Sequence, residues 1–113
     1  MMRMTLRALC AAALLGTSFA AHALSGEDMF NYCSENACGG YFVGAFDALR
    51  IAGAIGGEKM AKATLVCAPA EVSDDEIVDV ALTYLQQHEQ SRHLQAANLA
   101  LRAWRERWPC AKR

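Results

Sequence analysis

The residues of this 113-residue chain best suited to chemistry are its five cysteines: Cys10, Cys33, Cys38, Cys67 and Cys110. Cysteine thiols form disulfides, bind metal ions or act as nucleophiles. Cys10 lies in an N-terminal segment with the features of a targeting signal, which leaves four cysteines in the rest of the chain. An even number of cysteines in a short exported domain is typical of a disulfide framework. We therefore expect the four downstream cysteines to form two disulfides.

A zinc site is the main alternative for these four thiols. Structural zinc sites usually combine two close pairs of Cys or His ligands. Cys33 and Cys38 form one loose pair with four residues between them, whereas Cys67 and Cys110 stand alone. The spacing favours disulfides over a metal site, and we expect neither a metal ion nor a cofactor.

No set of residues typical of catalysis accompanies the cysteines. His88 and His93 are the only histidines after residue 22, and neither belongs to a recognisable Ser-His-Asp or Cys-His set. The carboxylates of residues 74–76 directly follow Ser73, a position at which they cap a helix. The glycines lack a nucleotide-binding pattern. We therefore expect a binding or structural protein and not an enzyme.

Residues 1–23 resemble a secretory signal peptide. Arg3 and Arg7 give a basic start, residues 8–15 are apolar, and Ala21-His22-Ala23 is a cleavage motif of small residues. The apolar run is shorter than the ~20 residues of a membrane-spanning helix. We predict cleavage after Ala23, export to the periplasm and no stable membrane anchor afterwards.

The predicted mature domain, residues 24–113, is 90 residues long. It keeps nine of the eleven basic side chains and all twelve acidic ones, which gives a net charge of −3. This charge excludes a general attraction to nucleic acid and would complement a basic partner surface. A domain of this size buries only about 60–65% of its unfolded surface, so two disulfides of roughly 2–4 kcal/mol each would supply much of its stability.

Helical periodicity dominates the mature domain. Ser25 and Asp28 predict the N-terminal cap of a short helix over residues 26–34. A second helix follows Cys38, and its apolar positions recur every three or four residues. These positions are Phe42, Phe46, Leu49 and Gly53. The stretch after this helix is the least regular, although residues 58–63 can form one or two helical turns.

Two further helices complete the expected set. Ser73 and Glu76 form a capping-box pattern before a helix that ends near residues 87–89. The predicted buried face of this helix comprises Ile77, Val80, Ala81, Tyr84, Leu85 and His88. The predicted apolar face of the last helix comprises Leu94, Ala97, Leu101, Trp104 and Trp108.

These elements predict an all-α fold, a small disulfide-stapled bundle of about four helices. The short link between the last two helices requires them to be antiparallel, which returns Cys110 to the neighbourhood of Cys67. This arrangement favours the pairs Cys67–Cys110 and Cys33–Cys38. The crossed pairs Cys33–Cys110 and Cys38–Cys67 stay open, because all four thiols can gather at one end of the bundle.

Three motifs in order give the chain a resemblance to a known family. They are Cys38-Gly-Gly-Tyr41-Phe-Val-Gly44-Ala-Phe-Asp47-Ala-Leu49; then Cys67-Ala-Pro69 and Val72-Ser73 with a helix ending in Tyr84-Leu85; and last Arg92-His93, Ala96-Ala97 and Trp108-Pro109-Cys110. Together they span almost all of the predicted mature domain. They resemble the type VI secretion amidase immunity (Tai) family and its Rap-type resistance-protein relatives. The motif positions are Gly40, Tyr41, Gly44, Asp47, Pro69, Tyr84, Leu85 and Pro109. Glu89 departs from the pattern, which has proline there.

The resemblance implies a small helical periplasmic protein, in many members a homodimer. Such proteins bind a toxic peptidoglycan amidase delivered by type VI secretion and block its active-site cleft with a protruding loop. Two polar stretches flanked by helices, residues 56–62 and 88–93, are our candidates for that loop. The candidate contact residues are Glu58, Lys59, Lys62, Glu89, Arg92 and His93.

Two other functions stay open at this point. One is a periplasmic acid-stress chaperone, in which the carboxylates concentrated in residues 74–79 would act as a protonation trigger. Light scattering of a client protein at pH ~2–3 would distinguish it, because those carboxylates are protonated there. The other is an exported helical binding domain with an unknown partner.

Overall fold

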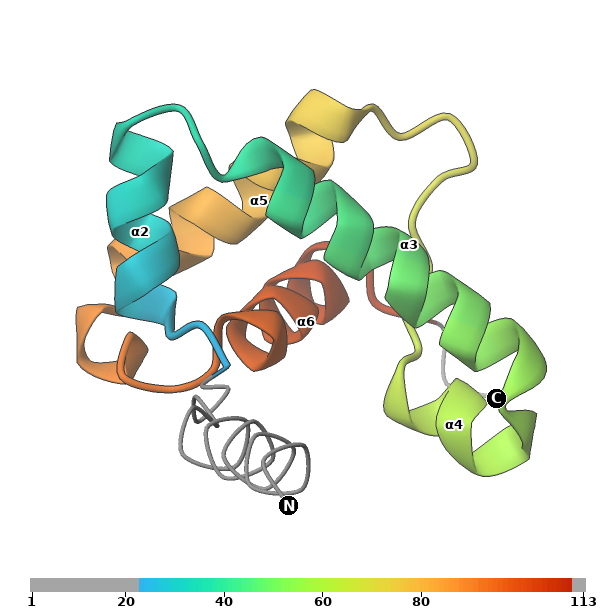
Figure 1. Cartoon of the computed structure of the whole chain (residues 1–113). Helices are drawn as coiled ribbons and strands as arrows, with labels where there is room; N and C mark the ends of the chain where they lie inside the picture. The colour runs from blue at the N-terminus through green and yellow to red at the C-terminus, as the bar shows by residue number, and fades with distance from the viewer. Residues whose placement is uncertain (1–22, 111–113) are drawn as a thin grey trace, which may run out of the picture.

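The computed structural model describes residues 23–110, and residues 1–22 of the predicted signal peptide lie outside this range. Within it there are five α-helices and one short 3-10 turn (Figure 1). They are α2 (Gly26–Ser34), α3 (Gly39–Ile55), α4 (Gly57–Ala63), α5 (Asp74–Gln87), η1 (Glu89–Ser91) and α6 (Ala96–Arg107). The all-α prediction is confirmed, and α4 forms as a fifth helix where one or two helical turns were expected.

Both predicted N-terminal caps form, but the acidic residue three positions after the capping serine has a different partner in each. Ser25 and Asp28 make a complete capping box, with Ser25 Oγ accepting from the Asp28 N–H at 3.1 Å and Asp28 Oδ2 accepting from the Ser25 N–H at 3.0 Å. Ser73 Oγ accepts from the Glu76 N–H at 3.2 Å. The Glu76 carboxylate instead lies 3.6 Å from Arg107 of α6, so this acid joins two helices and does not close its own cap.

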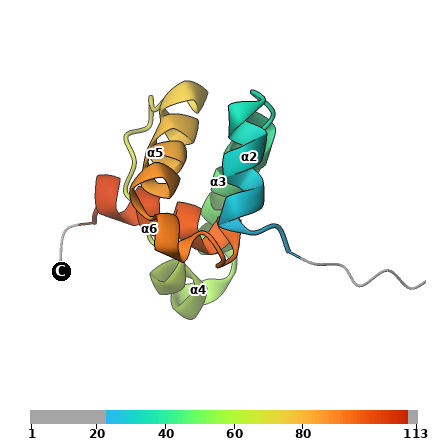
Figure 2. The same cartoon turned by 90° about the vertical axis from the view of Figure 1, so that its left-hand side faces the viewer.

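The helices pack around an antiparallel α5–α6 pair. Figure 2 shows α2 and α5 standing side by side, with α6 running beneath them. Both α2 and α3 contact α5 and α6, whereas α4 folds back along the C-terminal half of α3. The antiparallel sense is confirmed by a hydrogen bond from Trp104 Nε1, late in α6, to the Ile77 carbonyl oxygen, early in α5, at 3.0 Å.

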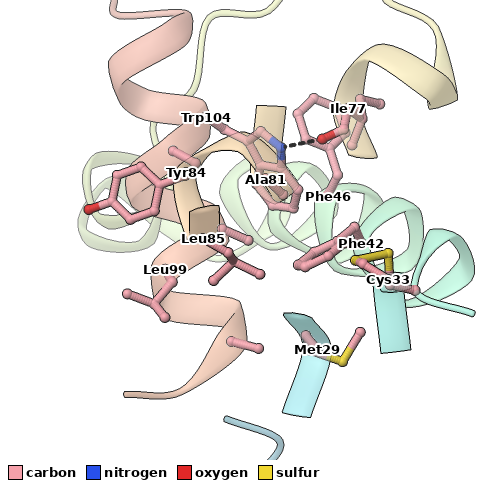
Figure 3. Packing of buried hydrophobic residues seen from close by; sticks show 14 of the residues in the cluster. Met29, Cys33, Phe42, Phe46, Ile77, Ala81, Tyr84, Leu85, Leu99 and Trp104 are labelled. Carbon is pink, nitrogen blue, oxygen red and sulfur yellow. Dashed lines mark hydrogen bonds between the residues drawn. A yellow bond between two sulfur atoms is a disulfide. The ribbon is translucent and has the colours of Figure 1, made fainter. Parts of the chain in front are cut away.

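The core is a cluster of apolar side chains from four of the helices, centred on aromatic rings (Figure 3). Trp104 and Phe42 are fully buried. The ring of Phe46 packs edge-on against Trp104, with centroids 5.1 Å apart, and against Trp108 at 6.2 Å. The remaining members are Met29, Cys33, Cys38, Ile77, Ala81, Tyr84, Leu85, Ala96, Leu99, Ala100 and Ala103.

The buried face of α6 differs from the prediction. Its centre lies at Leu99, Ala100 and Ala103, while Ala97 is exposed and Leu101 is half-buried. The reason is that α6 is covered by α5 on one side and by α2 and α3 on others, so its buried face is wider than one stripe. Alanines suit this position because small side chains let neighbouring helices approach closely.

Backbone hydrogen bonds join the start of α2 to the segment before α6. The Gly26 N–H donates to the Leu94 carbonyl and the Glu27 N–H to the Arg92 carbonyl, each at 2.8 Å. The Ala96 N–H donates to the carbonyl of Leu24 at 2.8 Å. Within residues 23–110, this pairing is the one β-bridge-like contact, and it fixes α2 to the α5–α6 connection.

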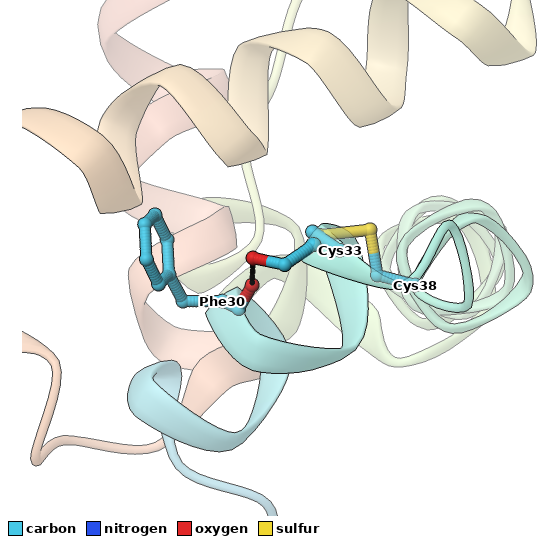
Figure 4. Close-up of a disulfide and its surroundings, with 4 residues drawn as sticks. Phe30, Cys33 and Cys38 are labelled. Atoms are coloured by element: carbon cyan, nitrogen blue, oxygen red, sulfur yellow. Dashed lines mark hydrogen bonds between the residues drawn. A yellow bond between two sulfur atoms is a disulfide. The ribbon is translucent and has the colours of Figure 1, made fainter.

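Two disulfides are present, in the pairing that the sequence favoured. Cys33–Cys38 closes the turn between α2 and α3, with its Cα atoms 4.7 Å apart, and both cysteines are buried (Figure 4). Cys67–Cys110 joins the segment before α5 to the residues after α6, with Cα atoms 5.1 Å apart. A hydrogen bond of 3.0 Å from the Cys67 N–H to the Trp108 carbonyl supports this second junction.

Candidate partner-binding surfaces

The first predicted contact stretch, residues 88–93, is used largely inside the molecule. Arg92 Nε donates to the Leu85 carbonyl at 2.7 Å, its guanidinium lies 3.7 Å from the centroid of the Phe30 ring, and it approaches Glu27 at 3.6 Å. These three contacts hold Arg92 against α2 and the end of α5. The group therefore stabilises the fold and is poorly placed to bind a partner.

The histidines of this stretch make local contacts. His88 caps the end of α5, stacks on the Tyr84 ring at 3.8 Å and has its Nδ1 2.8 Å from the Tyr84 carbonyl oxygen. His93 Nδ1 lies 3.0 Å from the Gln90 carbonyl oxygen, and its side chain is exposed. Glu89 is exposed as well, so Glu89 and His93 remain the accessible candidates here.

The second predicted stretch, residues 56–62, is the helix α4 and not a loop. It has no buried residue, and Glu58, Lys59 and Lys62 are all exposed. Lys62 Nζ lies 3.4 Å from Glu58 Oε1, one turn earlier, in a largely exposed pair that contributes little to stability. Helix α4 therefore offers charged side chains to solvent without using them in the core.

Large apolar side chains are exposed in and beside α3 and α4. Six are exposed in the described part of the chain, and four of them lie in or beside α3 and α4. These four are Ile51 (59% exposed), Ile55 (80%), Met60 (42%) and Leu65 (47%). The sequence carried a signal for the first two, since Ile51 and Ile55 are one turn apart and off the buried stripe of Phe42 and Phe46. The prediction missed them.

We name residues 47–65 the α3–α4 arm. In Figure 1 the C-terminal half of α3 and all of α4 project beyond α2, α5 and α6. The link at residues 88–93 lies at the opposite end of the molecule, beside the start of α2. The two predicted contact stretches therefore do not form one surface.

The glycines of the arm shape its turn. A Cβ on Gly53 would come within 2.8 Å of Thr64 Oγ1, so the absence of a side chain lets the end of α4 approach α3. Gly57 has φ of +81°, a backbone conformation that favours glycine. Thr64 Oγ1 also donates to the Met60 carbonyl at 2.9 Å. The arm is thus a defined helical hairpin.

The family-motif residues have different environments. Gly40, Gly44, Asp47, Pro69 and Pro109 are exposed, whereas Tyr84 and Leu85 belong to the core. Tyr41 is half-buried and packs edge-on against Phe42, with ring centroids 5.5 Å apart. Burial raises the pKa of the Tyr41 phenol above 10.0, and a smaller opposing effect comes from a hydrogen bond with the Ala97 backbone.

Charge is unevenly distributed between the arm and the rest of the described chain. The arm carries three basic and two acidic side chains, a net charge of +1. The remaining described residues carry four basic and ten acidic side chains, a net charge of −6.

In residues 23–110 no three His, Cys, Asp or Glu side chains cluster in a way that could hold a metal ion. No helix in that range is long and apolar enough to cross a membrane.

These features describe a disulfide-bonded helical domain with one projecting arm. Comparison with protein families gives a match to the model of Rap1a immunity proteins over residues 5–110. No curated protein and no solved structure matches the chain.

Proposed function

The chain belongs to the Rap1a immunity protein family, and we propose on that basis that it neutralises a toxic effector delivered by type VI secretion. We propose further that the effector is a peptidoglycan amidase, as for the Tai-type proteins that the sequence resembles. The mechanism is steric: the bound protein fills or covers the amidase cleft and denies the substrate access. No covalent step on this chain is needed.

The observation that carries the proposal is the family match across 106 of the 113 residues. The fold supports it, because a binder gains affinity when its surface is rigid before contact. Two disulfides and the buried core hold the described helices in one arrangement. The exposed apolar side chains of the α3–α4 arm supply a surface suited to protein contact.

We propose that the protein acts in the periplasm after cleavage of residues 1–23. The two disulfides support this location, since such bonds persist in oxidising compartments. Peptidoglycan is also found there, so effector and immunity protein would meet where the damage occurs. The homodimer implied by the resemblance stays a prediction, and sedimentation analysis of the purified protein measures it.

The direct test uses purified protein spanning residues 24–113 and any peptidoglycan amidase encoded beside its gene. We expect peptidoglycan cleavage to fall to background at a one-to-one molar ratio, because a bound inhibitor blocks every cleft. An unrelated peptidoglycan amidase serves as the control and is expected to stay active. If no adjacent amidase is inhibited, the proposed function is wrong for this chain.

A second test addresses location. A bacterial host that exports the amidase to its periplasm should lyse, and co-expression of the full chain should restore growth. The same chain without residues 1–23 should fail to protect, because it stays in the cytoplasm. Equal protection by both forms would contradict the proposed compartment while leaving effector binding intact.

A further inference from the structure

We infer that the α3–α4 arm is the surface that enters the effector, and that it fits a concave apolar recess bordered by carboxylates. This inference rests on the proposed function and deepens it by assigning the contact surface and the chemistry of its counterpart. It differs from a simple loop insertion, because the element is a hairpin of two helices.

The first argument is the exposure of aliphatic side chains. Ile55 and Ile51 point away from the core on the outer side of α3, while Met60 lies in the middle of α4 and Leu65 two residues after its end. The other large aliphatic and aromatic residues of α3 are buried or half-buried. Apolar surface that gains nothing from the fold of its own chain is typical of a protein-binding site.

The second argument is shape. The arm projects from the bundle, so it presents a convex surface (Figure 1). Clefts that bind substrates are concave, and a narrow convex element can enter one whereas a flat face cannot. The arm is also fixed at its base, because Cys67, two residues after Leu65, is bonded to Cys110. A pre-ordered element loses less conformational entropy when it binds.

The third argument is charge. Arg50 is exposed beside Ile51, and within residues 23–110 it forms no ion pair. Its guanidinium lies 5.8 Å from the centroid of the Phe46 ring, which leaves its outer face open. Lys59 and Lys62 add two ammonium groups to α4. The arm also carries Asp47 and Glu58, and Glu58 pairs with Lys62, so Arg50 and Lys59 supply its excess positive charge of +1. This charge complements carboxylates on a partner.

A second copy of this chain is the less suitable occupant. Contact between two arms brings together two surfaces that each carry a net charge of +1, so it gains no net charge attraction. The acidic body of another copy could accept the arm, so the oligomeric state of each variant has to be measured in the test.

The test compares two arm variants with two matched controls in a binding titration against the adjacent amidase. The variant I51D/I55D places carboxylates at the two exposed isoleucines of α3, and R50E/K59E reverses two cations of the arm. Tyr32→Asp alters an exposed apolar residue on α2, and Arg102→Glu reverses an exposed cation on α6. Circular dichroism and the thiol count verify that each variant is folded.

We expect I51D/I55D to weaken binding at least ~30-fold, as for residues at the centre of an interface. R50E/K59E should weaken it roughly tenfold, mainly through slower association, and the loss should shrink at high salt. Both controls should bind like the original protein. A photo-cross-linking residue at position 55 should join the effector, whereas one at position 32 should not.

The possible failures are distinguishable. If the original protein binds the amidase and the arm variants bind equally well, the arm assignment is overturned and the proposed function stands. If the arm variants change only the oligomeric state, the surface is a self-contact and the inference is overturned. If the original protein does not bind, both proposals are wrong. Cross-linking from position 55 gives the same decision should a variant fail to fold.

Discussion

At the scale of single residues, Arg92 holds the link between α5 and α6 against α2. Its place in a polar link made it a predicted partner contact. The structure instead brings it to Glu27 and Phe30, which are more than 60 positions away in the chain. Nothing in the local pattern reveals such a contact, because it depends on how α2 packs against α5. Exposure of an arginine cannot be inferred from its polarity alone.

Replacing Arg92 should therefore reduce stability. Arg92→Ala removes a hydrogen bond to Leu85 and a cation–π contact with Phe30, so we expect a loss of about 2–3 kcal/mol. Arg92→Lys keeps the positive charge but lacks the planar guanidinium, so its stability should lie between that of the original protein and that of Arg92→Ala. Urea unfolding measures the change. Arg102→Ala, on the exposed side of α6, is the control and should stay within about 0.5 kcal/mol.

Tyr41 predicts a pH dependence at the alkaline end. Burial raises the pKa of its phenol in the folded protein, so above pH 10.0 the native state holds a proton that the unfolded state releases. Its contribution to stability is complete below pH 10.0 and is lost as the pH rises through the folded-state pKa. Tyr41→Phe should lose less stability than the original protein over that range.

Thermal unfolding between pH ~9 and ~11 checks the Tyr41 prediction, with phenolate absorbance as a second measure. Tyr32→Phe is the comparison, because Tyr32 is an exposed residue of α2. If Tyr41→Phe and Tyr32→Phe give the same alkaline profile, burial of Tyr41 has no influence on the alkaline transition.

At the scale of elements, the sequence predicts most helix boundaries well. Local signals set them: Ser25 and Ser73 cap α2 and α5, and both helices begin at the residue after the cap. The buried face of α6 is less predictable, because three helices cover it and periodicity reports only one stripe. The exposed apolar residues of the arm were missed for a related reason. Buried faces are recognised by assuming that the apolar residues of a helix are buried, and the exposed apolar residues of α3 and α4 do not follow this assumption.

Replacement by alanine should change the stability of the protein in opposite directions at Gly26 and at Gly44. A Cβ on Gly26 would overlap the Leu99 side chain and come within 3.0 Å of the Arg92 carbonyl oxygen, so Gly26→Ala should destabilise by about 1–3 kcal/mol. A Cβ on Gly44 meets nothing within 4 Å, so Gly44→Ala should stabilise α3 by up to about 1 kcal/mol. Chemical denaturation of both variants measures the pair. A loss of stability in Gly44→Ala would show that the outer side of α3 is constrained in the free protein.

At the scale of the whole molecule, the sequence favoured one disulfide pairing but did not exclude the crossed pairing. The antiparallel sense of α5 and α6 places Cys110 near Cys67, and this is what the structure shows. The crossed pairing could be ruled out only by knowing where α2 and α3 lie. Their position depends on packing against α5 and α6, which one sequence does not specify.

The two disulfides should differ in their contribution to stability. In the chain-entropy model, a loop of 43 residues is worth about 4 kcal/mol and one of 5 residues about 2 kcal/mol. The double variant C67S/C110S should therefore lose more stability than C33S/C38S. Denaturant titration compares them, and intact mass should be four hydrogens lower than that of the fully reduced chain. Equal losses would mean that the buried position of Cys33–Cys38 offsets its shorter loop.

The sequence separations of the two disulfides also set an order in time. Cys33 and Cys38 are joined across a five-residue separation, so their thiols meet as soon as the turn between α2 and α3 forms. Cys67 and Cys110 meet only after α5 and α6 have come together, because the chain between them consists of that helical pair and its connections. The second disulfide can therefore close only when α5 and α6 have packed together. An exported chain interrupted between the two events would carry one early bond and two free thiols open to the wrong partner.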